Sequence, residues 1–128
     1  MTAAVIEKAI SLGLKNLYFH INHVLVPPAV NAILQDENSQ IHALIGPSHV
    51  SVISGADIYQ PLVARYKLPM VVSGFEPVDV MQSLLMIIKQ LLANEAKVEI
   101  QYSRAVTWQG NLKAQQLMDR YLQPRRFF

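Results

Sequence analysis

Short apolar runs alternate along this chain with longer segments in which apolar residues recur every three or four positions. The short runs have the length and the branched or aromatic composition that is typical of strands: Leu17–Ile21, Ile41–Ile45, Pro69–Ser73 and, more weakly, Val98–Tyr102. The periodic segments predict helices: Thr2–Leu12, residues 27–34, Asp57–Tyr66, Val78–Ala93 and Asn111–Leu122.

This alternation recurs at intervals of about 25–30 residues, which favours βα units and a parallel sheet with helices on both faces. At 128 residues the chain has the length of one domain, so we expect a single α/β domain over residues 1–128. The Thr2–Leu12 helix has an apolar face that needs a sheet to cover, but no strand precedes it. We therefore expect that the first strand is missing from this chain.

The Val78–Ala93 segment carries the longest helical pattern, and its apolar stripe is wide. The stripe follows helical spacing and consists of Met81, Leu84, Leu85, Ile88, Leu91 and Leu92, with Met86 and Ile87 widening it. Such a stripe is typical of a helix that is buried on more than one side. Hydrophobic residues make up 52% of the chain and charged residues only 16%, which indicates surface that a partner or missing sequence covers.

Charge and cysteine content exclude several classes of protein. The net charge of +2 is far from that of a nucleic-acid binder, and the one basic cluster, Arg125-Arg126, is interpreted as a frayed end. The longest apolar run, Leu84–Ile88, is too short to cross a membrane, and no secretory signal is visible. The chain has no cysteine, so disulfides, thiolate metal sites and a cysteine nucleophile are excluded. These features favour a cytoplasmic protein.

Three loops carry most of the side chains that can do chemistry: residues 22–28, 46–51 and 74–79. Each follows a predicted strand and opens a predicted helix, and the whole of Gly46–Gly55 is predicted to be a loop. In a parallel α/β sheet the loops after the strands emerge on one side, where ligands bind. We therefore expect one polar edge.

His49 is the leading candidate on this edge. Its imidazole could act as a general base, donate a hydrogen bond or bind a metal, or it could simply bond a backbone carbonyl. His23, at the end of the first predicted strand, is a weaker candidate for a ligand role. His20 and His42 lie inside strand patterns and are interpreted as structural.

Glu76 and Asp79 form a second candidate group near the start of the Val78 helix. The two carboxylates could share acid–base work or bind a cation. Alternatively they cap the helix and face its positive dipole end, as Asp57 is predicted to do for its own helix. Gly74 supplies either a positive φ or a close approach of the backbone to a ligand. Tyr102 and Arg104 could stack and bind an anion, although such residues more often pack on the surface.

Several enzyme signatures are absent from the sequence. It contains no G-x-G-x-x-G, Walker loop, nucleophile elbow or H-E-x-x-H motif. The four histidines lack the close spacing of a self-contained metal site. The residues alone therefore indicate an α/β domain with a polar edge and leave its task open.

Five short motifs occur in a fixed order along the chain: His23–Pro28, Pro47–Ser51, Gly74–Asp79, Gln101–Val106 and Gly110-Asn111. They resemble the His-x-x-x-Pro-Pro, Pro-Gly-His-Val-Ser, Gly-Phe-Glu-Pro-Leu-Asp, Gln-Tyr-x-Arg-x-Val and Gly-Asn motifs of the HypD family. That family acts in the maturation of nickel–iron hydrogenases. The order and spacing agree across nearly the whole chain, which makes the resemblance specific.

The resemblance implies an α/β domain of a larger scaffold protein that works with HypC and HypE to assemble an Fe(CN)2CO moiety. In that picture His49, Glu76 and Asp79 are the catalytic candidates in a cleft where iron is held and cyanide is attached. The cleft would be lined by His23, Pro47, Ser51, Gly74 and Phe75.

The departures from the family pattern also matter. The Cys-Gly-x-His and Gly-Pro-Gly-Cys-Pro-Val-Cys motifs are missing, as are the cysteines that carry the family's 4Fe-4S cluster and the Gly-Phe-Glu-Thr-Thr strand expected before Thr2. Within the motifs, Ser48 replaces a glycine. We therefore expect a middle-domain fragment that holds no metal alone and needs the cysteine-bearing HypD segments as partners. Two alternatives stay open: a free-standing small-molecule enzyme that uses His49 with Glu76 or Asp79, and a non-functional gene remnant.

Overall fold

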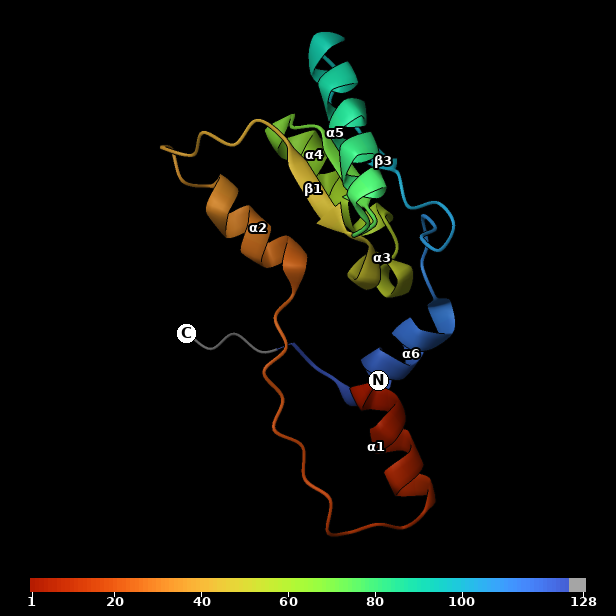
Figure 1. Ribbon diagram of the computed structural model, residues 1–128. Helices are drawn as coiled ribbons and strands as arrows, with labels where there is room; N and C mark the ends of the chain where they lie inside the picture. Colours follow the sequence, from red (N-terminus) through yellow and green to blue (C-terminus); the bar gives the residue numbers. More distant parts are fainter. Residues whose placement is uncertain (125–128) are drawn as a thin grey trace. The chain divides into compact units, whose positions relative to one another are not determined.

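The segment Val24–Asn111 contains a three-stranded parallel sheet flanked by helices (Figure 1). The computed structural model describes residues 1–124. The strands are β1 (Leu44–Pro47), β2 (Met70–Ser73) and β3 (Val98–Ile100), in the order β1-β2-β3. Met70 pairs with Leu44 on one side and with Val98 on the other. The predicted α/β class with a parallel sheet is confirmed.

Six α-helices and one short 3-10 turn accompany the strands within the described residues. They are α1 (Thr2–Ser11), α2 (Val26–Leu34), α3 (Ser48–Ser54), η1 (Asp57–Tyr59), α4 (Gln60–Tyr66), α5 (Pro77–Leu92) and α6 (Leu112–Tyr121). In residues 1–124 no helix is long and apolar enough to cross a membrane. The basic pair Arg125-Arg126 lies outside the described residues.

The chain divides into two compact units. One contains the sheet and spans Val24–Asn111, and the other combines Met1–His23 with the segment from Leu112 onward. In the second unit α1 contacts α6, and Arg120 forms an ion pair of 3.3 Å with Glu7. The single domain expected over residues 1–128 stays a prediction.

The core of the sheet unit forms around β2, whose four residues are all buried. Alternate residues of a strand point to opposite faces. Met70 and Val72 therefore share one face, where they belong to a cluster with Tyr59 of η1 and the first turns of α4. Val71 faces the other way, toward the side on which α5 contacts β2. Helices thus cover both faces of the strand that bears the central loop.

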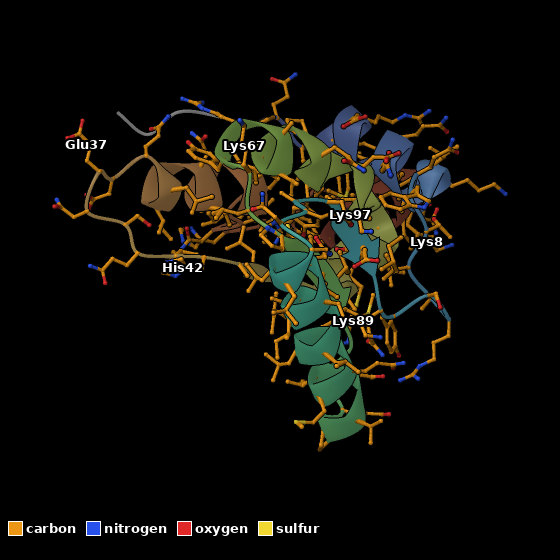
Figure 2. All side chains as sticks on the ribbon, turned by 90° about the horizontal axis from the view of Figure 1, so that it is seen from above. Lys8, Glu37, His42, Lys67, Lys89 and Lys97 are labelled. Carbon is orange, nitrogen blue, oxygen red and sulfur yellow. The ribbon has the colours of Figure 1, made fainter. Side chains whose placement is uncertain are left out.

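The apolar stripe of α5 lies on its exposed side, and the prediction that this stripe would be buried is wrong. Its members are between 41% and 84% exposed: Met81, Leu84, Leu85, Ile88, Leu91 and Leu92. The side chains of the helix, Lys89 among them, are drawn in Figure 2. Of the two residues that widen the stripe, Ile87 is buried, and the other buried residues of the helix are Asp79, Ser83 and Gln90.

Polar contacts explain this orientation of α5. Gln90 accepts a hydrogen bond from the backbone N–H of Lys97 (3.0 Å) and donates one to Glu99 of β3 (2.6 Å). The hydroxyl of Ser83 donates a hydrogen bond to the backbone carbonyl of Asp79 within the helix, so this buried polar group has a partner. Because the bonds from Gln90 reach β3 and the segment before it, they turn the polar side of α5 toward the sheet. Hydrophobic periodicity contains no information about such bonds.

The predicted strand Leu17–Ile21 is also wrong. These residues have no regular secondary structure and are exposed, Tyr18 to 88%. A strand requires a neighbouring strand to take up its backbone hydrogen bonds. Among the described residues the sheet consists of β1, β2 and β3 only, so this apolar run pairs with none of them.

The predicted loop Gly46–Gly55 contains a helix, α3, which begins directly after β1. Ser51 donates a hydrogen bond to the carbonyl of Pro47 (2.7 Å), and Ser54 donates one to that of Val50 (3.0 Å). Gly55 ends the helix at φ +81°, where a side chain would collide with the carbonyl of Trp108. Asp57 is not a helix cap, because it is the first residue of η1 and its side chain makes no capping bond.

Candidate functional site

The carboxyl ends of the three strands lie side by side at one edge of the sheet. Pro47, the last residue of β1, pairs with Ser73, the last residue of β2. Ile100, the last residue of β3, pairs with Val72. The segments that follow these strands therefore emerge together, as the sequence predicted for the second and third loops.

His49 and Phe75 connect the segments after β1 and β2. Their rings stack with centroids 4.6 Å apart and an angle of 20° between planes. Both residues are exposed, Phe75 to 62%. The stack orients the plane of the imidazole, and because the residue as a whole is exposed, His49 is accessible to a ligand.

Asp79 is the buried charge of the site. It lies in the first turn of α5, and its side chain is only 4% exposed. Its Oδ1 accepts a hydrogen bond from Nε2 of Gln101 (2.9 Å), and its Oδ2 accepts one from Nη2 of Arg104 (2.7 Å). Both oxygens are thus occupied, which is the usual condition for burying a carboxylate.

Gln101 ties the segment after β3 to the turn after β2. Its side-chain oxygen accepts the backbone N–H of Gly74 (3.1 Å), while its Nε2 also donates to Gln82 of α5 (3.0 Å). One amide therefore contacts a loop, a helix and the buried Asp79. This arrangement positions the Gly74–Glu76 turn relative to the third strand.

Arg104 contacts both carboxylates. The same nitrogen that binds Asp79 also lies 3.3 Å from Oε2 of Glu76, whose side chain is 75% exposed. The guanidinium stacks over the ring of Tyr102 at 4.4 Å from the centroid. Its pKa is raised above the ordinary value, first by the Tyr102 side chain and further by the negative charges of Asp79 and Glu76.

Gly74 has the close-approach role that the sequence left as one of two possibilities. A Cβ at this position would overlap the carboxylate of Asp79 and the ring of Tyr102. Its φ is not among the positive values of the chain, so space rather than backbone conformation requires glycine here.

The remaining predicted site residues differ in their surroundings. Ser51 is fully buried, bonded to the carbonyl of Pro47 and 3.3 Å from the hydroxyl of Tyr59. It therefore fastens the start of α3 to the core. His23 belongs to the unit of α1 and α6, and its ligand role stays a prediction. Glu76 occupies the N-cap position of α5, as the capping alternative predicted, but its side chain makes no capping hydrogen bond and pairs with Arg104 instead.

Sequence reasoning ranked Gln101, Tyr102 and Arg104 too low. Their signal was present, because Gln101 and Tyr102 end the predicted strand Val98–Tyr102 and Arg104 follows it, which places all three at the same sheet edge as Glu76 and Asp79. This strand was the weakest of the predicted strands, which is why its end received less weight.

The residues present do not fit an iron–sulfur cluster. The chain has no cysteine to supply thiolates, and residues 1–124 contain no group of three His, Asp or Glu side chains that could hold a metal ion. The site offers instead an exposed imidazole that stacks on Phe75, and a guanidinium that pairs with one buried and one exposed carboxylate.

Comparison with known proteins assigns the chain to a family. A family model described as "HypD: Hydrogenase formation hypA family" matches residues 1–127. The chain belongs to the HypD family. The hydrogenase maturation factor HypD of Azotobacter vinelandii is 47% identical over 132 residues, which cover 99% of this chain and 35% of that protein.

Two further relatives match a smaller part of the chain. The hydrogenase maturation factor HypD of Escherichia coli K12 is 37% identical over 115 residues, covering 90% of this chain and 31% of that protein. A putative hydrogenase expression/formation protein of Methanocaldococcus jannaschii is 45% identical over 105 residues, covering 81% of this chain and 29% of that protein. The chain thus spans about a third of the length of these relatives.

Proposed function

We propose that this chain is a scaffold and iron-handling domain in nickel–iron hydrogenase maturation. It assists the assembly of the Fe(CN)2CO moiety, together with HypC and HypE, in the cytoplasm. The observation that carries the proposal is the convergence of three HypD-type motifs at one sheet edge. His49 stacks on Phe75, and Gln101 and Arg104 bond to Asp79.

The roles that we propose for these residues follow from how exposed their side chains are to solvent. His49 and Glu76 are exposed and are the groups that would contact an iron-bearing substrate. A neutral imidazole can ligate or donate a hydrogen bond, and a carboxylate can accept a proton. Asp79, with both oxygens occupied, acts through the residues that it holds in place. We therefore assign it a positioning role rather than direct contact with the substrate.

The lack of cysteine sets the conditions under which this function operates. Thiolates that hold iron must come from the cysteine-bearing HypD segments, because this chain contains none. The chain alone is accordingly expected to retain no iron, and its contribution is to orient the substrate within a complex.

Anaerobic co-expression tests this proposal. The chain is produced with HypC and with the cysteine-bearing segments of a relative such as the Azotobacter vinelandii protein, and the complex is purified through a tag on this chain. Iron is then measured in the purified complex. His49→Ala and Glu76→Gln serve as site variants. His42→Ala is the matched control, because His42 is an exposed histidine of the same unit on the loop before β1 (Figure 2).

We expect copurification with iron for the unsubstituted chain and for His42→Ala, and a several-fold loss of iron for both site variants without loss of the partners. Absence of association would contradict the scaffold role. Full iron retention in His49→Ala and Glu76→Gln would contradict the assignment of the site.

A further inference from the structure

The position of Arg104 determines which kind of ligand the two carboxylates can accept. A divalent cation that bridges two carboxylates lies about 2.0–2.6 Å from an oxygen of each. Nη2 of Arg104 lies 2.7 Å from Oδ2 of Asp79 and 3.3 Å from Oε2 of Glu76. A guanidinium nitrogen therefore fills the place between these oxygens that a bridging cation would need.

Two other contacts and the space at Gly74 hold the guanidinium and its carboxylate partner in this place. The stack on Tyr102 fixes the plane of the guanidinium. Gln101 occupies the second oxygen of Asp79, so this carboxylate cannot rotate away without breaking a buried hydrogen bond. The absence of a side chain on Gly74 leaves the room in which the carboxylate of Asp79 lies.

We infer that Arg104 is a specificity-determining residue that excludes bare divalent cations from Asp79 and Glu76. The side chains of Asp79, Glu76 and Arg104 together carry a net charge of −1. Oδ2 of Asp79, which a bridging metal ion would need, already accepts a hydrogen bond from Arg104. This inference rests on the proposed function and refines it. The site accepts iron only in a form that already carries its own ligands, and it does not recruit the free ion.

The same chain offers an internal comparison. Asp36 and Glu37 are adjacent exposed carboxylates, and neither forms an ion pair within residues 1–124 (Glu37 is labelled in Figure 2). If charge alone governed cation binding, both acidic pairs would attract a metal ion. If Arg104 acts as inferred, only the pair without a guanidinium does so.

Titration of the isolated chain with Mn²⁺ tests the inference. Mn²⁺ is a paramagnetic hard cation, and the broadening of backbone amide signals in NMR spectra locates it residue by residue. In the unsubstituted chain we expect weaker broadening at residues 74–80 than at Asp36 and Glu37. Equal or stronger broadening at residues 74–80 would overturn the inference, and this comparison requires no variant.

Two substitutions provide a gain-of-binding test. Arg104→Gln keeps a polar side chain but removes the charge and shortens the side chain, and Arg104→Ala removes the side chain beyond Cβ. We expect Mn²⁺ to bind at residues 74–80 at least tenfold more tightly in either variant, and the double variant Arg104→Gln/Glu76→Gln to lose this gain. A folded Arg104→Gln chain without increased binding would overturn the inference.

Arg120→Gln is the matched control. Arg120 pairs with Glu7 at the same distance of 3.3 Å that joins Arg104 to Glu76, but among residues 1–124 it forms no ion pair with a second carboxylate. Its removal is expected to produce no tenfold gain in Mn²⁺ binding near Glu7. The whole test uses the chain without partners, so its outcome is independent of whether the maturation complex forms.

Discussion

The substitution Gly74→Ala probes the packing on which the candidate site depends. Gly74 lies where β2 turns toward α5, and a Cβ there would overlap Oδ2 of Asp79 and come within 2.5 Å of Cδ2 of Tyr102. Asp79 cannot move aside freely, because Gln101 and Arg104 hold its two oxygens. The added methyl group must therefore displace a buried carboxylate or an aromatic ring.

The expected loss in the free energy of unfolding of Gly74→Ala has three contributions. Overpacking costs about 1–3 kcal/mol, and weakening one hydrogen bond to a charged group costs about 1.5–3 kcal/mol. Alanine restricts the unfolded chain, which offsets about 0.4–1 kcal/mol. We expect a net loss of about 2–4 kcal/mol in the free energy of unfolding. At a urea dependence of about 2 kcal/mol per M, the midpoint falls by about 1–2 M.

Gly46→Ala is the matched control in the same sheet. A Cβ at Gly46 would come within 2.6 Å of Cε of Met70, the mobile end of a flexible side chain. Because this atom can shift, we expect a loss below about 1.5 kcal/mol. The assay is urea unfolding followed by the fluorescence of Trp108, the single tryptophan of the chain, which lies in the same compact unit. A Gly74→Ala midpoint as high as that of Gly46→Ala would refute the reasoning.

Three further predictions concern single side chains. Asp79→Asn should lower the free energy of unfolding by about 1.5–3 kcal/mol, because it breaks a charge-assisted hydrogen bond to a buried carboxylate. Glu76→Gln should lower it by less than about 1 kcal/mol, because Glu76 is exposed. Equal losses for the two variants in urea unfolding would contradict the different burial of the two carboxylates. Lys67→Gly should raise the thermal midpoint, corresponding to about 0.5–1 kcal/mol, because Lys67 adopts φ 52° at the end of α4; a lower midpoint would contradict this. The pKa of Lys97 is raised, first by its hydrogen bond to Glu95, so the stability that this pair supplies is complete below the ordinary value of 10.5 and is lost as pH rises through the higher folded value. The difference in thermal midpoint between the unsubstituted chain and Lys97→Met should therefore stay constant from neutral pH to 10.5 and shrink above it; a decline that begins below pH 10.5 would argue against the pairing.

The fold class could be predicted from the sequence because strand–helix alternation requires only local information. β2 and α5 agree with the predicted Pro69–Ser73 and Val78–Ala93 to within one residue at nearly every end. Both segments lie in the sheet unit, where local propensity and packing favour the same structure.

The orientation of α5 could not be predicted from the sequence. Hydrophobic periodicity identifies an apolar and a polar face of a helix. It does not tell which face packs on the sheet when residues of the polar face form hydrogen bonds to the sheet. The bonds of Gln90 to Glu99 and to the backbone of Lys97 decide the matter, and both partners follow the helix in sequence. Apolar surface that composition had indicated is therefore found on the outside of α5.

The failure at Leu17–Ile21 has a different cause. Its composition favours a strand, but strand formation depends on a neighbour, and β1, β2 and β3 are the strands that pair within the described residues. Helix α3 shows the opposite case, since it lies within the predicted loop Gly46–Gly55 and contains the β-branched residues Val50, Val52 and Ile53, which have low helix propensity.

The candidate site was predicted in part. Loop position alone brought Glu76, Asp79 and Gly74 together, and the stacking of His49 on Phe75 joins the second loop to them. The division between a buried Asp79 and an exposed Glu76 was not predictable, because it depends on Arg104 reaching across from the loop after β3.

Infrared spectroscopy of the anaerobically purified complex tests the central claim most directly. If this chain is a scaffold domain for the Fe(CN)2CO moiety, cyanide and carbonyl stretches appear when it is co-expressed with the cysteine-bearing HypD segments and HypC. They should disappear when this chain is omitted and weaken in His49→Ala. Equal bands without this chain, or stoichiometric iron with cyanide bands on this chain alone, would contradict the account.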